Sequence, residues 1–244
     1  MLGLRERYVE AVQAVQHHRG QSELTPSVLA AACVAVLPVD GAGISMNQRQ
    51  LRVPLGWSGD AAAVAERTQT TLGEGPCVSA AAAETALVVD ADGLADRWPV
   101  YAVELTRRTP FRSVASIPLG TPGQPVFGAL DLYASRPDLT TVLIVDEAAA
   151  AVADPIASFL SGMLDEVYEY EVEPPAWWGE GPAVDRADVW TAVGMLIAAN
   201  EFDDVDDTAA LARLRGFAFR HDLTLDETAD RLLNRQLTPR SVLH

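Results

Sequence analysis

Apolar residues recur at two different spacings along the first 165 residues of the chain. Leu4, Val9 and Val12 follow a helical period and predict a helix over residues 4–20. Pro26 suits the first turn of a second helix that runs to about Leu37. Shorter strand-like runs are broken by turn residues. The predicted strands cover residues 43–46, 51–55, 86–89, 113–118 and 126–133, and further helices cover 60–70, 100–108 and 145–164.

This mixture of helices with antiparallel-looking strands predicts one α+β domain, an antiparallel sheet flanked by helices, over residues 1–165. Its last element, residues 145–164, is a long apolar helix that could close the core or extend a dimer interface. The composition then changes at Glu166. Residues 166–184 are rich in charge, proline and glycine, which is typical of a linker. Trp177 and Trp178 within it are expected to dock on the first domain or on a second subunit.

Beyond Asp185 the apolar period is helical throughout, so residues 185–244 are predicted to form a small all-α domain of three helices. Thr224 followed by Glu227 is a capping-box pattern that starts the third helix at Thr224. The acidic stretch 201–207 separates the first two helices, and its later carboxylates favour the start of the second. A bundle this short is expected to need docking or dimerisation for stability. The three apolar stripes contain Val189, Ala192, Val193, Leu196 and Ile197, then Leu211, Leu214, Phe217 and Ala218, then Leu225, Ala229, Leu232 and Leu233.

Charge limits the partners that the chain can bind without specificity. A net charge of −16 over 244 residues works against indiscriminate contact with polyphosphates, so any nucleic-acid contact must be local. All 18 basic residues are arginine, whose planar fork of donors suits phosphates and guanine edges. The N-terminus lacks the apolar core of a signal peptide, and no apolar stretch approaches the roughly 20 residues of a membrane span. We therefore expect a cytoplasmic protein without a membrane partner.

Chemistry-bearing residues are sparse in the sequence. The four histidines form no metalloprotease or nucleophile-elbow pattern and no phosphate-binding loop is present, so no enzyme activity is predicted. Two cysteines cannot make a disulfide framework or a zinc site of their own, and the sequence names no metal or cofactor. Cys33 lies in an apolar helical run and is expected in the core. Cys77 follows a turn-rich Gly-Glu-Gly-Pro loop, where no nearby positive charge is expected to activate its thiol.

A small-molecule ligand would need a pocket in the first domain. Four aromatic residues could line it, or they could be ordinary core residues: Trp98, Tyr101, Phe111 and Tyr133. Asp131 alternates with Leu130 and Leu132 in a strand-like run, so its side chain projects opposite to theirs, toward solvent or the pocket. The candidate ligand-binding set is Cys77, Trp98, Tyr101, Phe111 and Asp131.

Two ordered sets of motifs carry a resemblance to known families. The first helix of the small domain contains Ala192-x-Gly194-Met195-Leu196; Ala210, Leu214, Arg215 and Ala218 follow in the second, and Leu225 and Ala229 in the third. On these residues, 185–238 resemble the ANTAR family. Residues 25–165 resemble the GAF domains that commonly precede ANTAR modules in actinobacterial proteins. They contain Gly73-Glu74-Gly75-Pro76-Cys77, Arg97-Trp98-Pro99, Arg112-Ser113-Val114-Ala115, Pro118-Leu119 and Gly128-Ala129-Leu130-Asp131-Leu132-Tyr133.

The resemblance implies a transcription antitermination regulator. Its GAF domain would sense a small ligand or signal, and its ANTAR module would bind paired RNA stem-loops in nascent transcripts, usually as a homodimer. Candidate RNA contacts are Arg213, Arg215, Arg220, His221, Arg231 and Arg235. Arg213 and Arg220 would share one helix face and Arg231 and Arg235 another. The alternative is a solvated face balanced by Asp226, Glu227 and Asp230, with Arg215 packing through its stem.

Two other functions remain open on the sequence. From Asp185 onward, 7 arginines face 11 acids, a local charge of 7 − 11 = −4. Val193 and Asp222 also stand where many ANTAR sequences have basic or polar residues. These features favour a regulator that acts through protein contacts instead of RNA. The second possibility is an enzyme, because some GAF domains reduce free methionine sulfoxide with cysteines.

Gly194 is unfavourable inside a helix, and a close helix–helix approach would explain it.

Overall fold

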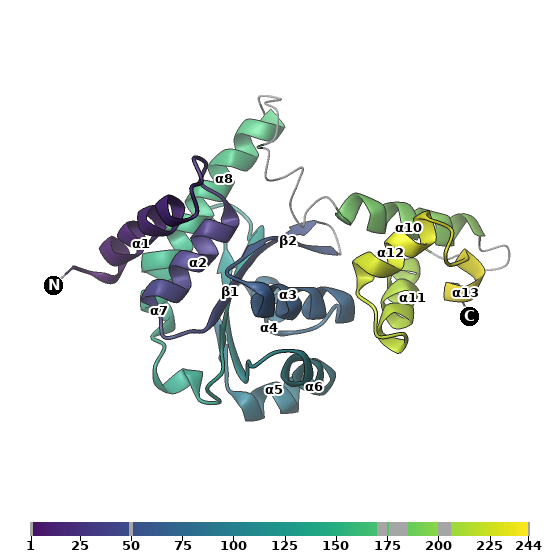
Figure 1. Ribbon diagram of the computed structural model, residues 1–244, viewed down its shortest axis with the longest axis horizontal. Coiled ribbons are helices and arrows are strands. Elements are labelled where there is room, and N and C mark those ends of the chain that lie inside the picture. Colours follow the sequence, from purple (N-terminus) through teal and green to yellow (C-terminus); the bar gives the residue numbers. More distant parts are fainter. Residues whose placement is uncertain (1, 49–50, 170–174, 176–184, 200–205, 244) are drawn as a thin grey trace.

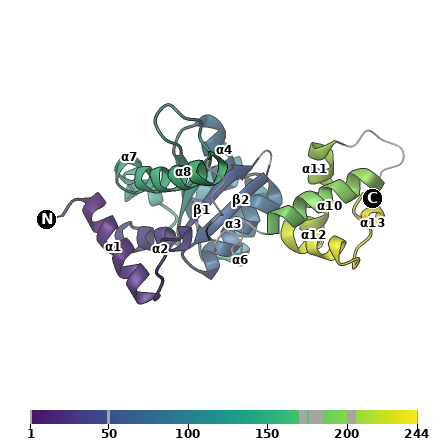
Figure 2. The same cartoon turned by 90° about the horizontal axis from the view of Figure 1, so that it is seen from above.

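The computed structural model describes residues 2–48, 51–169, 175, 185–199 and 206–243 (Figure 1). These residues form two parts. The α+β part comprises residues 2–48 and 51–169, and the helical part comprises residues 185–199 and 206–243. Figure 2 shows the helical part at one side of the α+β part, with the first helix of the chain at the opposite side.

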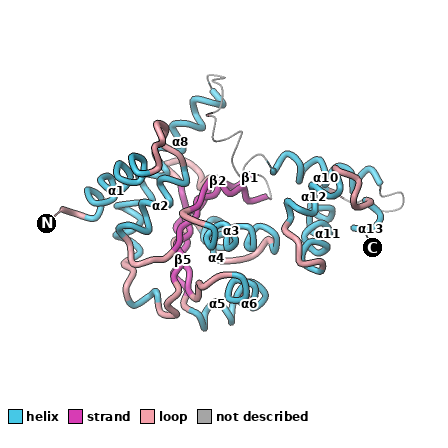
Figure 3. The backbone as a smooth tube through the Cα atoms, in the orientation of Figure 1, coloured by secondary structure: helices cyan, strands magenta, loops and turns pink. Residues whose placement is uncertain are grey.

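A five-stranded antiparallel sheet is the centre of the α+β part, and it confirms the predicted α+β fold class. The strand order is β2-β1-β5-β4-β3, and Figure 3 shows the strands crossing the middle of this part. Pairing between β1 and β2 shifts by one residue between Ile44 and Ser45, as a β-bulge does. The strands are β1 (Gly41–Gln48), β2 (Leu51–Trp57), β3 (Leu87–Val89), β4 (Ser113–Leu119) and β5 (Gly128–Ala134).

Helices cover both faces of this sheet, as Figure 1 shows. On one face lie α1 (Leu4–His18), α2 (Pro26–Val36), α7 (Val145–Ala148) and α8 (Asp154–Glu169). On the other lie α3 (Asp60–Leu72), α4 (Pro76–Ala83), α5 (Ala91–Arg97) and α6 (Pro99–Arg108). Strand alternation divides the side chains between the two faces: Leu130 and Leu132 of β5 join the core under α1 and α2, whereas Tyr133 joins the core under α3 and α6. Asp131 therefore also lies on the α3 face.

The helical part has a separate hydrophobic cluster, formed mainly by the three predicted apolar stripes and joined by Leu51 of β2. Its elements are α10 (Asp185–Ala199), α11 (Asp207–Arg220), α12 (Leu225–Leu233) and a short α13 (Pro239–Leu243). The predicted capping box is confirmed, because Thr224 accepts a hydrogen bond from the backbone of Glu227 and the Glu227 side chain accepts one from the backbone of Thr224. Asp206, from the acidic stretch, caps α11 by accepting from the backbone N of Ala209.

Several elements differ from the sequence prediction, among them α13, a fourth helix in the helical part where three were predicted. The long helix expected over residues 145–164 contains a five-residue π-helical turn, Ala149–Ala153, and α8 continues to Glu169, beyond the predicted boundary. Cys77 was expected in a loop but lies in the first turn of α4, where Pro76 occupies the first helical position. The segment Ala91–Arg97 forms α5, which the sequence pattern did not predict.

None of the helices in the described ranges is both long and apolar enough to cross a membrane. Trp177 and Trp178, predicted to dock, lie outside the described residues.

Candidate functional site

Polar side chains gather on the sheet face that α3 and α4 cover. We call this group the buried polar cluster. Strand alternation places five of its members on this face, and α3 and α4 supply the other three. All of them are buried, which is unusual for charged residues unless they are paired. The members are Ser45, Arg52, Glu66, Gln69, Cys77, Ser116, Asp131 and Tyr133.

Arg52 is the centre of this cluster. Its Nη2 lies 2.6 Å from Asp131 Oδ2 and 3.0 Å from Glu66 Oε2. Its Nε donates to Ser45 Oγ at 2.5 Å, and its Nη1 donates to Cys77 Sγ. One guanidinium group therefore connects β1 and β2 with β5, α3 and α4, and it uses donors on all three of its nitrogens.

One positive charge faces two carboxyl groups in this cluster. Burial raises the pKa of Glu66 to about 8, although Arg52 opposes this shift. Glu66 Oε1 accepts from the Tyr133 hydroxyl at 2.7 Å, whereas Oε2 has no partner with hydrogen-bond geometry. A protonated Glu66 leaves Arg52 and Asp131 as a balanced pair at neutral pH, which avoids a second buried negative charge.

Gln69 holds the Asp131 carboxylate, the Tyr133 hydroxyl and the start of α4 together. Its Nε2 donates to Asp131 Oδ2 at 2.8 Å and to the Tyr133 hydroxyl at 3.0 Å. Its Oε1 accepts from the backbone N of Cys77 at 3.2 Å, so the amide ties α3 to the start of α4. Ser116 Oγ donates to the other oxygen of Asp131. The Asp131 carboxylate is thus held by donors from three different elements.

The expectation that no positive charge lies near Cys77 is wrong, because Arg52 contacts its sulfur. Residue spacing could not show this contact, since 25 residues separate the two. Burial nevertheless raises the pKa of Cys77 well above its usual value, and the opposing effect of Arg52 is smaller. The group is therefore a buried thiol and not the exposed thiolate that redox chemistry favours. Cys33 is buried in the core, as predicted.

The predicted ligand residues share one sheet face, but none is exposed. Trp98, Tyr101 and Phe111 are buried in the hydrophobic cluster under α3 and α6. The Phe111 ring stacks on Tyr133 with 5.1 Å between ring centroids. Tyr101 has a buried hydroxyl without a hydrogen-bond partner. Cys77 and Asp131 belong to the buried polar cluster, so a ligand-binding role for these five residues stays a prediction.

The sequence pattern did not indicate Ser45, Arg52, Glu66, Gln69 or Ser116 as site residues. A signal for Arg52 exists, because it is a lone charge inside the strand-like run Leu51–Leu55. Its two acidic partners are distant in sequence, so the pattern alone could not identify them. Within the described ranges, no group of three or more histidine, cysteine and acidic side chains could hold a metal ion.

A second polar arrangement lies where the helical part meets the α+β part. We call this contact the seam. Arg107 Nη2 donates to Asp222 Oδ1 at 2.7 Å, and Arg108 also donates to this oxygen. The backbone N of Leu225 donates to Thr71 Oγ1 at 3.1 Å. These bonds join α6 and α3 to the turn between α11 and α12.

Two further contacts complete the seam, one apolar and one at a glycine. Leu51, at the start of β2, belongs to the hydrophobic core of the helical part. The guanidinium of Arg215 covers Gly73, where an added Cβ would lie 2.8 Å from Arg215 Cζ. Gly73 also has a φ of +72° as the C-cap of α3, so this position requires glycine for two reasons.

The candidate RNA residues separate into two groups. Arg220, His221, Arg231 and Arg235 are exposed, whereas Arg213 and Arg215 are half-buried. The predicted helix face shared by Arg231 and Arg235 is wrong: α12 ends at Leu233, and Arg235 has a left-handed φ of +58°. The ring of His221 lies 4.1 Å from that of Phe217, so it packs against its own helix end.

The packing role expected for Gly194 is also wrong. An added Cβ at this position would meet nothing within 4 Å, so no neighbouring helix approaches it. Gly194 is exposed on α10, and helix packing does not explain why glycine stands there.

Comparisons with known proteins find only distant likenesses. No protein-family model matches the chain, and no curated protein matches it. Similar solved structures include the GAF domain of a phosphoenolpyruvate-protein phosphotransferase from Coxiella burnetii, with 15% identity over 66% of this chain and 96% of that chain and a TM-score of 0.46.

A free methionine-R-sulfoxide reductase from Neisseria meningitidis, in complex with its substrate, has 17% identity over 66% of this chain and 90% of its own, with a TM-score of 0.42. A GAF domain from A. aeolicus in an inactive state has 12% identity over 65% and 98%, also with a TM-score of 0.42. At these identities and TM-scores the likenesses assign neither a family nor an activity.

Proposed function

We propose that this chain is a cytoplasmic, signal-responsive transcription antitermination regulator. Residues 1–165 act as a GAF-type sensor, 166–184 as a linker, and 185–244 as an ANTAR module that binds paired RNA stem-loops as a homodimer. The observation that carries the proposal is the ordered motif set from Ala192 to Ala229, which falls on helices α10, α11 and α12, whose apolar stripes pack together in one hydrophobic cluster.

Exposed arginines supply the chemistry for RNA contact. Arg220, Arg231 and Arg235 are accessible to phosphates and to the unstacked bases of RNA loops. Because the helical part carries net negative charge, this contact must be confined to a small surface. Recognition would then depend on loop shape and base contacts more than on long-range attraction.

The contacts of Asp222 indicate how RNA binding by the helical part would be regulated. It departs from many ANTAR sequences, and it pairs with Arg107 and Arg108 of the sensor. The same seam covers Gly73 with Arg215, one of the predicted RNA contacts. An RNA-binding module held in this way would bind RNA more tightly after it leaves the sensor.

The test is binding of the full-length protein to a tandem stem-loop RNA and to a scrambled RNA of equal length, across a salt series. We expect a preference for the stem-loops, and we expect the double variant Arg231→Ala with Arg235→Ala to reduce it. The matched control is Arg5→Ala with Arg7→Ala, which removes two exposed arginines from α1. Equal binding of both RNAs at every salt concentration would overturn the proposal.

The acidic balance of the helical part favours a second candidate, a regulator that acts through protein contacts. Crosslinking of the tagged protein in cells distinguishes the two functions. Enrichment of leader-region stem-loops supports the RNA function. A stable protein partner together with a flat RNA profile supports the second candidate.

A further inference from the structure

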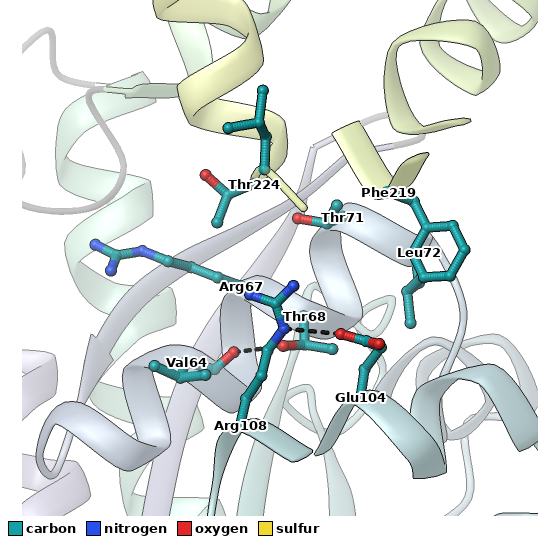
Figure 4. Close-up of a pocket in the computed structure, with 10 residues that line it drawn as sticks. Val64, Arg67, Thr68, Thr71, Leu72, Glu104, Arg108, Phe219 and Thr224 are labelled. Atoms are coloured by element: carbon teal, nitrogen blue, oxygen red, sulfur yellow. Dashed lines mark hydrogen bonds and ion pairs between the residues drawn. The ribbon is translucent and has the colours of Figure 1, made fainter. Parts of the chain in front are cut away.

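Helix α3 connects the buried polar cluster with the seam. Glu66 and Gln69 belong to the cluster, and both are fully buried. Thr71 follows in the last turn of the same helix and accepts a hydrogen bond from the backbone N of Leu225 in the helical part. Figure 4 shows the end of α3, with Thr71, next to the turn that carries Thr224. Because a helix moves as a rigid element, a displacement of α3 at the cluster also displaces its contact with the helical part.

Strand β2 makes the same connection within two residues. Leu51 packs in the hydrophobic cluster of the helical part. Arg52, the next residue, is the centre of the buried polar cluster. Successive side chains of a strand point to opposite faces, so one short segment can contact both. Two elements, α3 and β2, therefore join the cluster to the docked helical part.

A cavity of about 270 Å³ lies between the buried polar cluster and the helical part. Arg52 and Gln69 line it on the side of the cluster, and Arg215 lines it from the helical part. The guanidinium of Arg215 also covers Gly73, another lining residue. The cavity is large enough for several water molecules, each of which takes up about 30 Å³ in the liquid. Docking of the helical part thus closes one side of a space through which water can reach the cluster.

The carboxyl group of Glu66 is tightly packed. It lies so close to Gly43 of β1 that a Cβ at that position would overlap it. The cation that faces it, Arg52, also faces Asp131. An ionised Glu66 would place a second buried negative charge beside one positive charge, which costs free energy unless water hydrates it. Hydration requires α3 to move away from β1 or the cavity to widen, and both movements loosen the seam.

The groups that face Glu66 come from β2, β5, α4 and α6. Arg52 favours the ionised carboxylate, whereas Asp131 opposes it. Burial has the largest effect and raises the pKa of Glu66 to about 8, so the carboxyl ionises in mildly alkaline solution. The titratable and charged groups around it are Arg52, Cys77, Tyr101, Asp131 and Tyr133.

We propose that docking of the helical part is controlled by pH: the helical part stays docked while Glu66 is protonated and is released when Glu66 ionises. Undocking admits water to the cluster and lowers the cost of the second carboxylate, so Glu66 ionises more readily in the undocked state. Linkage then requires that ionisation favour undocking. Resting on the proposed function, this inference makes a rise in pH the signal that frees the helical part to bind RNA.

Hydrogen exchange at the backbone N of Leu225 in the full-length protein measures docking, because this group bonds to Thr71. The rate in the wild type is divided by the rate in Glu66→Gln at the same pH, which cancels the effect of pH on the chemistry of exchange. We expect a ratio near one at pH 5 and roughly tenfold at pH 9, as a fall of about one in the pKa of Glu66 on undocking would produce. A ratio that does not rise between these pH values would overturn the proposal.

Two controls accompany this measurement. Glu10→Gln removes an exposed carboxylate from α1 and should exchange at Leu225 as the wild type does at both pH values. The backbone N of Arg112 donates to Ala134 O at 2.7 Å and reports the sheet. We expect stronger protection at Arg112 than at Leu225. Equal protection at the two groups would show that the helical part is released only when the whole protein unfolds, and would overturn the proposal.

Linkage also predicts the reciprocal effect. Asp222→Arg places a third cation beside Arg107 and Arg108 and so releases the helical part. Carbon-13 NMR of the Glu66 carboxyl should then give a pKa lower by about one than in the wild type. Asp230→Arg, at an exposed position on α12, should leave this pKa unchanged. Equal pKa values for Glu66 in Asp222→Arg and in the wild type would overturn the proposal.

A stem-loop RNA titration separates this inference from the proposed function. Release of the helical part at pH 9 supports the control by pH even if no RNA binds, and in that case only the antitermination function fails. RNA binding without any change of docking between pH 5 and pH 9 leaves the function intact and overturns the control by pH.

Discussion

Arg107 donates a 2.7 Å hydrogen bond to Asp222, although 115 residues separate the two in the sequence. Arg108 donates to the same carboxylate oxygen. The hydrogen bond from Arg107 lowers the pKa of Asp222, so this carboxylate keeps its charge through the neutral range. The pairing makes Asp222 a contact between the two parts of the chain, and it explains an acidic residue at the edge of a module expected to bind RNA.

Replacement of Asp222 should release the helical part. In Asp222→Arg the new cation faces Arg107 and Arg108, and repulsion replaces attraction. We expect faster hydrogen exchange at the backbone N of Leu225, whose bond to Thr71 exists only in the docked arrangement. Adding Arg107→Asp and Arg108→Asp should restore slow exchange. Asp230→Arg is the control, because Asp230 is exposed on α12 and accepts from Asn234 instead. Equal exchange rates in all these proteins would contradict the role of this ion pair.

The raised pKa of Glu66 should make stability depend on pH. The folded state holds the Glu66 proton up to a pH of about 8, whereas an unfolded glutamate loses it near its ordinary value. The stabilisation from this proton is therefore complete below the ordinary pKa of glutamate. It decreases as pH rises above that value and is lost once pH passes about 8. The slope of the unfolding free energy is at most about 1.4 kcal/mol per pH unit. Urea unfolding from pH 5 to pH 9 measures it. Glu66→Gln should flatten the curve, whereas Glu10→Gln, at an exposed position on α1, should leave it unchanged.

Removal of Arg52 should be among the most harmful substitutions in the α+β part. Arg52→Met leaves Asp131 buried without its cation, and breaking a buried pair in this way costs roughly 3–5 kcal/mol of unfolding free energy. Adding Asp131→Asn removes the orphaned charge and should recover part of the loss. The coupling between the two sites is measured by a double-mutant cycle in urea. Strictly additive losses would show that the two side chains do not act as a pair.

Gly194→Ala should stabilise the helical part. The position lies inside α10, with open space around it, so alanine removes the conformational cost of glycine, about 1 kcal/mol. Thermal unfolding measures the gain. Gly20→Ala is the contrasting variant: Gly20 also has open space but a φ of +63°, so alanine there should destabilise the protein. If Gly194→Ala is more stable but binds stem-loop RNA more weakly, the glycine serves close approach of RNA. A loss of stability would show that open space at Gly194 does not describe its environment.

The pattern of residues over short ranges was sufficient to predict most of the secondary structure. The capping box of Thr224 and Glu227, the apolar stripes of the helical part and the alternation of Asp131 with its leucine neighbours all act within a few residues, so sequence spacing determines them. The α4 helix was missed because the turn signal of Gly73 to Pro76 also marks a helix start.

The sequence by itself determined the helix caps and the strand alternation, because each depends on hydrogen bonds or apolar periods between near neighbours. Only the tertiary structure decided the charge partners. Arg52 meets Asp131 across 79 residues, and Asp222 meets Arg107 across 115. Electrostatic energy depends on the distance between charges and on the solvent around them, and both are properties of the folded chain that residue spacing does not contain.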